Sequence, residues 1–179
     1  SFSGVFVIAS LVVLMIVLNA FVFFLLLYLS QRIGKFLLVL FFLMNAIAVY
    51  FVATYGIIVD ESMIGNVFNT NYDESSSYFS YKMVLYLIFL GVLPSYFILR
   101  SKVERVSFKR FSILSSLTLL FALVLVFVNA SNWLWIDKNS KRLGGLAMPW
   151  SYVVNTSLFY IHESKKNEKE ILLPDAKIK

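Results

Sequence analysis

The sequence contains no cysteine, and His162 is the only histidine among its 179 residues. Without thiols the chain can form no disulfide bond and offers no thiolate ligand. A transition-metal site needs several His, Cys or carboxylate ligands, so we predict no metal and no cofactor in this chain. We expect His162, in a polar segment, to be a surface residue. Internal repeats and Gly-rich phosphate loops are also absent, and we predict no nucleic-acid partner.

Charged residues are missing from four long stretches, namely 1–31, 36–59, 83–99 and 111–136. The chain as a whole is 60% hydrophobic, with a mean hydropathy of +0.81, whereas soluble domains are nearer half apolar. A membrane-spanning helix needs about 20 apolar residues. We therefore predict four spans, near 5–29, 36–59, 83–99 and 111–128, within a transmembrane domain covering residues 1–131.

The positive charges gather in two of the loops between these spans. Arg32 and Lys35 follow the first span, and five cations against Glu104 alone follow the third. The segment from Asp60 to Lys82, by contrast, holds four acids and one lysine. The positive-inside rule then places the two basic loops in the cytoplasm. We expect the acidic loop and both ends of the chain to be periplasmic, in a multi-pass protein of a bacterial inner membrane.

The first residues lie almost inside a span and lack the basic start of a signal peptide. A periplasmic start without an export signal predicts that a further helix precedes this sequence.

The acidic loop carries an ordered stripe of polar residues. Asn66, Thr70 and Glu74 recur every fourth residue, and apolar residues recur at helical spacing on the opposite side. This pattern predicts an amphipathic helix near 61–80 at the membrane edge. An amide, a hydroxyl and a carboxylate in a row form a candidate headgroup site, although the wet face of a surface helix has the same pattern. Asp60, just before the stripe, fits an N-cap better than a catalytic acid.

After the fourth span the sequence becomes amphipathic again. Trp133, Trp135 and Trp150 suit the headgroup region. Pro149 suits the first turn of a helix, and apolar residues follow it at helical spacing. We predict a periplasmic interfacial segment over 132–163, and the highly charged stretch 164–179 reads as a linker.

Two amides, Asn19 and Asn45, lie within spans, where packing between helices is their expected role. The spans contain no Asp, Glu, Lys, Arg or His, which disfavours a transporter or channel subunit, because ion pathways usually contain such groups. A structural or scaffolding membrane domain remains a further alternative.

The stretch from Tyr55 to Thr70, YGIIVDESMIGNVFNT, is followed by Glu74. It resembles the membrane domain of the lipid A phosphoethanolamine transferases, which include the colistin-resistance enzymes. The shared pattern is Tyr-Gly, then Asp, then Met-Ile, then N-x-x-x-T-x-x-x-E after a span. The resemblance extends from the first span through the Pro149 helix and is sharpest in this stretch.

The resemblance implies five membrane helices followed by a periplasmic catalytic domain that holds zinc and a threonine nucleophile. Such enzymes move phosphoethanolamine from phosphatidylethanolamine to lipid A. It also implies that Asn66, Thr70 and Glu74 contact the lipid substrate. The catalytic domain is absent from this sequence, so neither Thr70 nor Thr156 is expected to be the nucleophile, and the chain alone should be inactive.

We therefore predict an all-α, polytopic transmembrane helical bundle with periplasmic amphipathic helices. Its expected task is to anchor a phosphoethanolamine transferase in the membrane and to bind the donor lipid.

Overall fold

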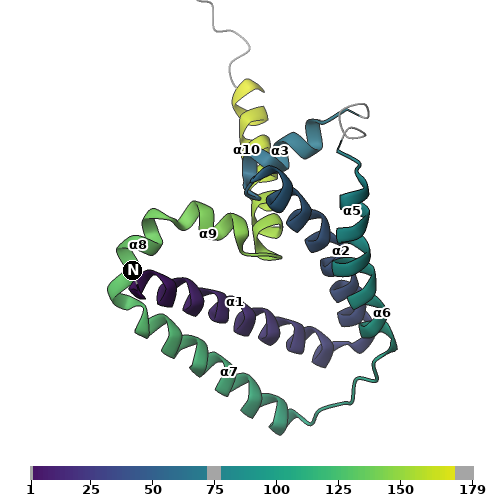
Figure 1. Ribbon diagram of the computed structural model, residues 1–179, viewed down its shortest axis with the longest axis vertical. Coiled ribbons are helices and arrows are strands. Elements are labelled where there is room, and N and C mark those ends of the chain that lie inside the picture. The colour runs from purple at the N-terminus through teal and green to yellow at the C-terminus, as the bar shows by residue number, and fades with distance from the viewer. Residues whose placement is uncertain (1, 72–77, 172–179) are drawn as a thin grey trace, which may run out of the picture.

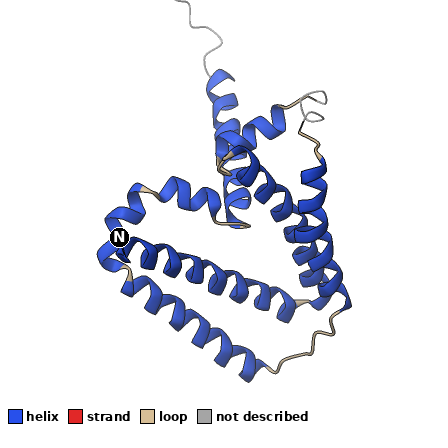
Figure 2. Cartoon of the chain, viewed as in Figure 1, coloured by secondary structure: helices blue, strands red, loops and turns tan. Residues whose placement is uncertain are grey.

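The computed structural model describes residues 2–71 and 78–171. Within these ranges the regular structure is entirely helical, as Figure 2 shows. The predicted all-α class is confirmed. Glu74 and its neighbours, at 72–77, lie outside the described residues.

Four helices are long and apolar enough to cross a membrane, as predicted from the uncharged stretches. They are α1 (Phe2–Leu29), α2 (Gln31–Tyr55), the segment Tyr81–Arg100 and α7 (Phe108–Val128). The second ends four residues earlier than the predicted Val59. Its end is set by Gly56, which adopts a left-handed φ of 66° and donates its N–H to the Val52 carbonyl. Glycine adopts this conformation without steric cost, and it commonly ends helices.

The third span is not a uniform α-helix. It comprises α5 (Tyr81–Tyr86), a π-helical turn η1 (Leu87–Val92) and α6 (Leu93–Arg100). Pro94 has no N–H to continue the helical ladder, and the Ser95 hydroxyl donates to the Gly91 carbonyl at 2.7 Å. A Cβ on Gly91 would lie 3.0 Å from the Leu43 side chain. The absence of a side chain there lets this span pack closely against α2.

The spans associate as two pairs. Helix α1 packs along α7, and α2 packs along the third span. Figure 1 shows the two pairs diverging from the turn that joins α1 to α2. The chain leaves α7 through η2 (Ala130–Asn132), α8 (Trp133–Lys138) and α9 (Ser140–Leu146), and then enters α10 (Trp150–Ile171).

The first turn of α10 lies between the two pairs and is held there by amides of the spans. The Asn19 side chain accepts a hydrogen bond from Trp150 Nε1 at 2.8 Å and donates to the Met148 carbonyl at 3.1 Å. The Tyr152 hydroxyl donates to Asn45 Oδ1 at 3.1 Å. Both in-span amides therefore serve contacts between helices, as predicted.

Within the segment predicted as interfacial, the beginning of α10 is packed against the spans. Ser151 and Tyr152 are only 3% and 6% exposed, and Trp150 bonds to a span instead of remaining wholly at the surface. Trp150 and Tyr152, on either side of Ser151, are held between the spans by the amides of Asn19 and Asn45. Helix α10 also continues to Ile171, well past the boundary predicted at residue 164.

The close approach of α1 and α2 at the turn that joins them can be tested. A Cβ on Gly34 would lie 2.9 Å from backbone atoms of Leu26 and Leu27, which cannot move aside cheaply. We expect Gly34→Ala to lower the free energy of unfolding in detergent by about 1–3 kcal/mol. The matched control is Gly144→Ala in α9, where a Cβ would meet no atom within 4 Å. Equal thermal unfolding of the two variants would contradict the close approach.

Candidate functional site

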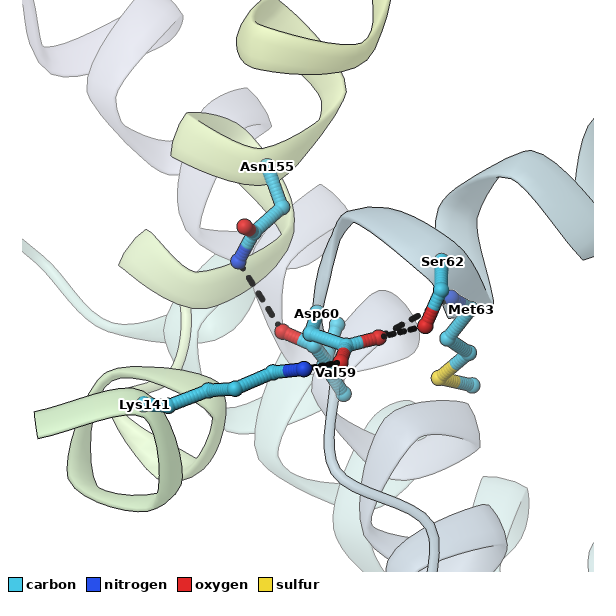
Figure 3. A network of polar contacts seen from close by, with 6 residues as sticks. All are labelled: Val59, Asp60, Ser62, Met63, Lys141 and Asn155. Atoms are coloured by element: carbon cyan, nitrogen blue, oxygen red, sulfur yellow. Dashed lines mark hydrogen bonds and ion pairs between the residues drawn. The ribbon is translucent and has the colours of Figure 1, made fainter. Parts of the chain in front are cut away.

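The site is built around the beginning of α3 (Glu61–Asn69), which follows the second span. Asp60 caps this helix, as its position in the sequence predicts: Asp60 Oδ1 accepts the Met63 N–H at 3.0 Å and the Ser62 hydroxyl at 2.6 Å. Its other oxygen, Oδ2, lies 3.1 Å from Lys141 Nζ of α9, as Figure 3 shows. The hydrogen bonds from Ser62 and Met63, together with Lys141, lower the pKa of Asp60 to about 2. Asp60 is therefore ionised at neutral pH.

The segment before α3 is held from two further sides. Asn155 of α10 donates from Nδ2 to the Val59 carbonyl at 3.0 Å (Figure 3) and to the Ser151 carbonyl at 2.7 Å. The Val59 N–H donates to the Gly145 carbonyl at 3.2 Å. A Cβ on Gly145 would lie 3.0 Å from Ile58, so glycine is needed for α9 to approach this closely. Helices α9 and α10 thereby fix where α3 begins.

An open cavity of about 870 Å³ lies between α3, α9 and α10. Its walls carry both signs of charge, from Asp60, Glu61 and Lys141. Ser151 also lines it, and the Ser151 hydroxyl is buried with no hydrogen-bond partner among the described residues. The remaining lining residues are small, polar or aromatic: Ser62, Gly65, Ser140, Gly144, Gly145, Ala147, Trp150, Val154, Asn155 and Phe159. Such a cavity has room and partners for a small polar group.

The predicted site residues Asn66 and Thr70 do not line this cavity; Asn66 directly follows the lining residue Gly65, and Thr70 lies at the far end of α3. Asn66 is exposed on α3 one helical turn after Ser62, which is part of the cavity wall. The Thr70 hydroxyl donates to the Asn66 carbonyl. The structure thus brings Asn66 and Thr70 together, while Glu74 lies outside the described residues.

The helix that carries the stripe is shorter than predicted. Helix α3 ends at Asn69, and Thr70 is its extended C-cap with φ −75° and ψ 130°. Residues 70–71 and 78–80 are not helical either, so the predicted helix over 61–80 is wrong at those positions. The Thr70 side chain bonds to the backbone one turn earlier, which competes with continuation of the helix.

His162 is exposed, as predicted, yet it has a partner that local sequence does not indicate. Its Nδ1 lies 2.6 Å from Glu61 Oε1, and this contact joins α10 to α3. Lys141 and Asn155 were also missed, because their contacts connect distant parts of the chain and no local spacing marks them. No group of three His, Asp or Glu residues able to hold a metal occurs in 2–71 or 78–171.

Known proteins match most of this chain. A family model described as phosphoethanolamine transferase EptA/EptB matches residues 14–164. The chain belongs to this family. The match includes the second half of α1, the other three spans, α3 and the beginning of α10, so the resemblance seen in the Tyr55–Thr70 stretch is confirmed over a far longer range.

Curated members of the family show the same relationship. The chain is 36% identical over 149 residues to phosphoethanolamine transferase EptA of Helicobacter pylori, covering 83% of the chain and 28% of that relative. It is 31% identical over 135 residues to EptA of Escherichia coli K12, covering 72% of the chain and 24% of the relative. The phosphatidylethanolamine transferase Mcr-2 of Escherichia coli is 33% identical over 91 residues, which are 51% of the chain and 17% of Mcr-2.

A solved structure agrees with the fold. The integral membrane protein lipooligosaccharide phosphoethanolamine transferase A (EptA) of Neisseria meningitidis matches with a TM-score of 0.74 at 25% identity. The match covers 87% of this chain and 29% of that protein. The chain therefore spans about a quarter of the length of the relatives it matches, and it is a multi-pass membrane member of the family.

The charge on Asp60 offers a test of how α3 is held. Its pKa is lowered from 3.8 to about 2, so its stabilising effect is present above about pH 4 and is lost as the pH falls toward 2. We expect Asp60→Asn to lower the free energy of unfolding by about 1 kcal/mol at pH 6, and the difference from wild type to shrink at pH 3. Chemical unfolding in detergent at both pH values measures this difference.

Asp137→Asn is the control for that experiment, because Asp137 is exposed and has no ion pair among the described residues. A loss as large for Asp137→Asn as for Asp60→Asn would contradict the assigned role of Asp60.

Proposed function

We propose that this chain is the membrane domain of an enzyme that transfers phosphoethanolamine from phosphatidylethanolamine to lipid A. It anchors the enzyme in the bacterial inner membrane and holds the donor lipid. Membership of the family supports the reaction class, and the short span of the chain relative to its relatives supports the role of a part. The zinc and the nucleophile belong to a periplasmic catalytic domain outside this chain. Without that domain the chain is inactive.

The observation that carries donor binding is the polar surface of α3. Ser62, Asn66 and Thr70 follow one another at intervals of one turn, beginning at the cavity wall. The cavity beside them presents the carboxylates of Asp60 and Glu61 together with the ammonium of Lys141. A zwitterionic headgroup carries an ammonium and a phosphate, and it needs both kinds of partner at short separation.

The donors and acceptors of the stripe can be assigned to parts of that headgroup. The amide of Asn66 offers two N–H donors to a phosphate or glycerol oxygen. The Thr70 hydroxyl gives its one proton to the Asn66 carbonyl, so in this arrangement its oxygen accepts a hydrogen bond from the ammonium or a hydroxyl group. The Glu74 carboxylate is the proposed ion partner of the ammonium.

The orientation follows from the charges at the two ends of the bundle. The basic loops after α1 and after α6 belong on the cytoplasmic side. Helix α3, which connects α2 to the third span, and helices α8, α9 and α10, which follow α7, are then periplasmic, as are both ends of the chain. In this orientation the stripe lies at the outer surface of the inner membrane, on the same side as the proposed acceptor, lipid A.

The stripe is tested in the full-length enzyme by replacing its members one at a time. We expect Asn66→Ala, Thr70→Val and Glu74→Ala each to lower transfer to lipid A by about tenfold or more, because a hydrogen bond to a charged group contributes about 1.5–3 kcal/mol. Mass spectrometry of lipid A measures the product, and immunoblotting confirms equal amounts of enzyme.

Thr118→Val is a matched control for Thr70→Val. The Thr118 hydroxyl also donates to the carbonyl four residues earlier, at Leu114, but on the exposed surface of α7. Transfer unchanged in the three stripe variants, or reduced equally in Thr118→Val, would reject the proposed donor site.

A further inference from the structure

We propose that the end of the bundle formed by the α1–α2 and α6–α7 connections binds an anionic phospholipid, seated on a cleft at the beginning of α7. This basic end is defined by six cations: Arg32, Arg100, Lys102, Arg105, Lys109 and Arg110. The inference is independent of the proposed transfer function, because it concerns the opposite end of the spans from α3.

Two side chains of α2 bring the separate basic segments together. Gln31 Nε2 donates to the Val103 carbonyl at 2.8 Å. Lys35 Nζ donates to the carbonyls of Leu99, at 3.3 Å, and Ser101. The connection after α6 is thereby held beside the beginning of α2, as Figure 1 shows. Lys35 is occupied by these carbonyls, so it is not counted among the six.

The six cations are not neutralised by the protein. The ion pairs in the described part of the chain are Lys141–Asp60 and His162–Glu61, both at the other end. Glu104 is the one acid in the connection, and it is exposed without an ion pair. Arg100 contacts Tyr96, through its hydroxyl at 2.6 Å and its ring face, which orients the guanidinium but leaves its charge uncompensated. Six positive charges against one negative charge require an anionic partner or counterions.

The cleft shows why a lipid fits better than a free anion. It has a volume of about 290 Å³ and is lined by Ser107, Lys109 and Arg110, followed by Ile113 and Leu114. The polar part offers a hydroxyl and two cations to a phosphate. Ile113 and Leu114 are 51% and 45% exposed and continue along α7 toward its apolar, membrane-spanning surface. A phosphate with an acyl chain uses both parts of the cleft at once.

The charge also sets the class of lipid. Each Lys or Arg beside an anionic membrane surface favours association by about fivefold. A phospholipid with net negative charge, such as phosphatidylglycerol, gains from this field. A zwitterionic lipid of the same chain length also carries a phosphate, but its net charge is zero and it gains far less from this field. The basic end is therefore selective by charge.

The test is native mass spectrometry of the purified chain in detergent, titrated with phosphatidylglycerol or phosphatidylcholine of identical acyl chains. We expect wild type to retain phosphatidylglycerol preferentially. Removing two charges in Lys109→Gln/Arg110→Gln should weaken phosphatidylglycerol binding by about 25-fold, which is fivefold for each charge, and should weaken phosphatidylcholine binding far less. The matched control is Lys138→Gln/Arg142→Gln, which removes the same charge from two exposed cations at the other end.

Equal weakening by the two double variants would show an effect of net charge alone and would overturn the site, as would an absence of preference in wild type. Thermal unfolding in the same detergent checks that both variants fold.

The apolar half of the cleft is tested separately. Ile113→Ala/Leu114→Ala should weaken binding of long-chain phosphatidylglycerol while leaving a dihexanoyl analogue unaffected. Displacement of long-chain phosphatidylglycerol by millimolar inorganic phosphate would show a simple anion site and would contradict the lipid assignment.

Discussion

The hydrogen bonds between the spans and the first turn of α10 are the contacts on which the polar end of the molecule depends. In an apolar medium an amide without a partner is costly, and Asn19 and Asn45 satisfy theirs with Trp150, the Met148 carbonyl and Tyr152. These bonds fix the position along α1 and α2 at which α10 begins. The rest of α10 is then placed against the connection that precedes α3.

The position of α3 follows from that placement. Asn155 lies one helical turn after Ser151 and donates to the Val59 carbonyl. One turn further, Phe159 stacks on Phe68 with ring centroids 5.7 Å apart, and its ring lies 3.1 Å from where a Cβ of Gly65 would be. Bulk at Gly65 would push α3 away from α10. The polar surface of α3 thus depends on half-buried amides within the spans, through a series of contacts along one face of α10.

The sequence was sufficient for features that local chemistry determines. Uncharged length predicted the four spans, because lipid tolerates few ionised groups. Asp60 was predictable as a cap, because its carboxylate satisfies N–H groups at the next helical turn. The end of α2 at Gly56 was not predicted, because the apolar run continues to Val59 and hydropathy does not indicate a left-handed backbone conformation. The glycine itself was the signal that could have placed the end of the helix.

Contacts between distant segments were beyond local patterns. The amphipathic beginning of α10 predicts a helix at a surface, yet Tyr152 is buried because Asn45 of α2 accepts a hydrogen bond from its hydroxyl. The candidate site shows the same difference between features that local sequence determines and contacts that join distant segments. Spacing and resemblance predict Asn66 and Thr70 as site residues, and that role stays a prediction, whereas Lys141 and Asn155 are recognised only once α9 and α10 are placed beside α3.

The two ends of the bundle differ in how their charges are compensated, and this difference decides what each can hold. At the α3 end, Asp60 and Glu61 already have Lys141 and His162 as partners within 3.1 Å. A ligand with a single charge gains little there, because it must compete with an existing pair, whereas a zwitterion can approach both members of a pair together. At the α7 end the cations have no acid partner among the described residues, so a single negative charge gains the full attraction. The two proposed lipid sites are therefore expected to differ in the headgroup that each prefers.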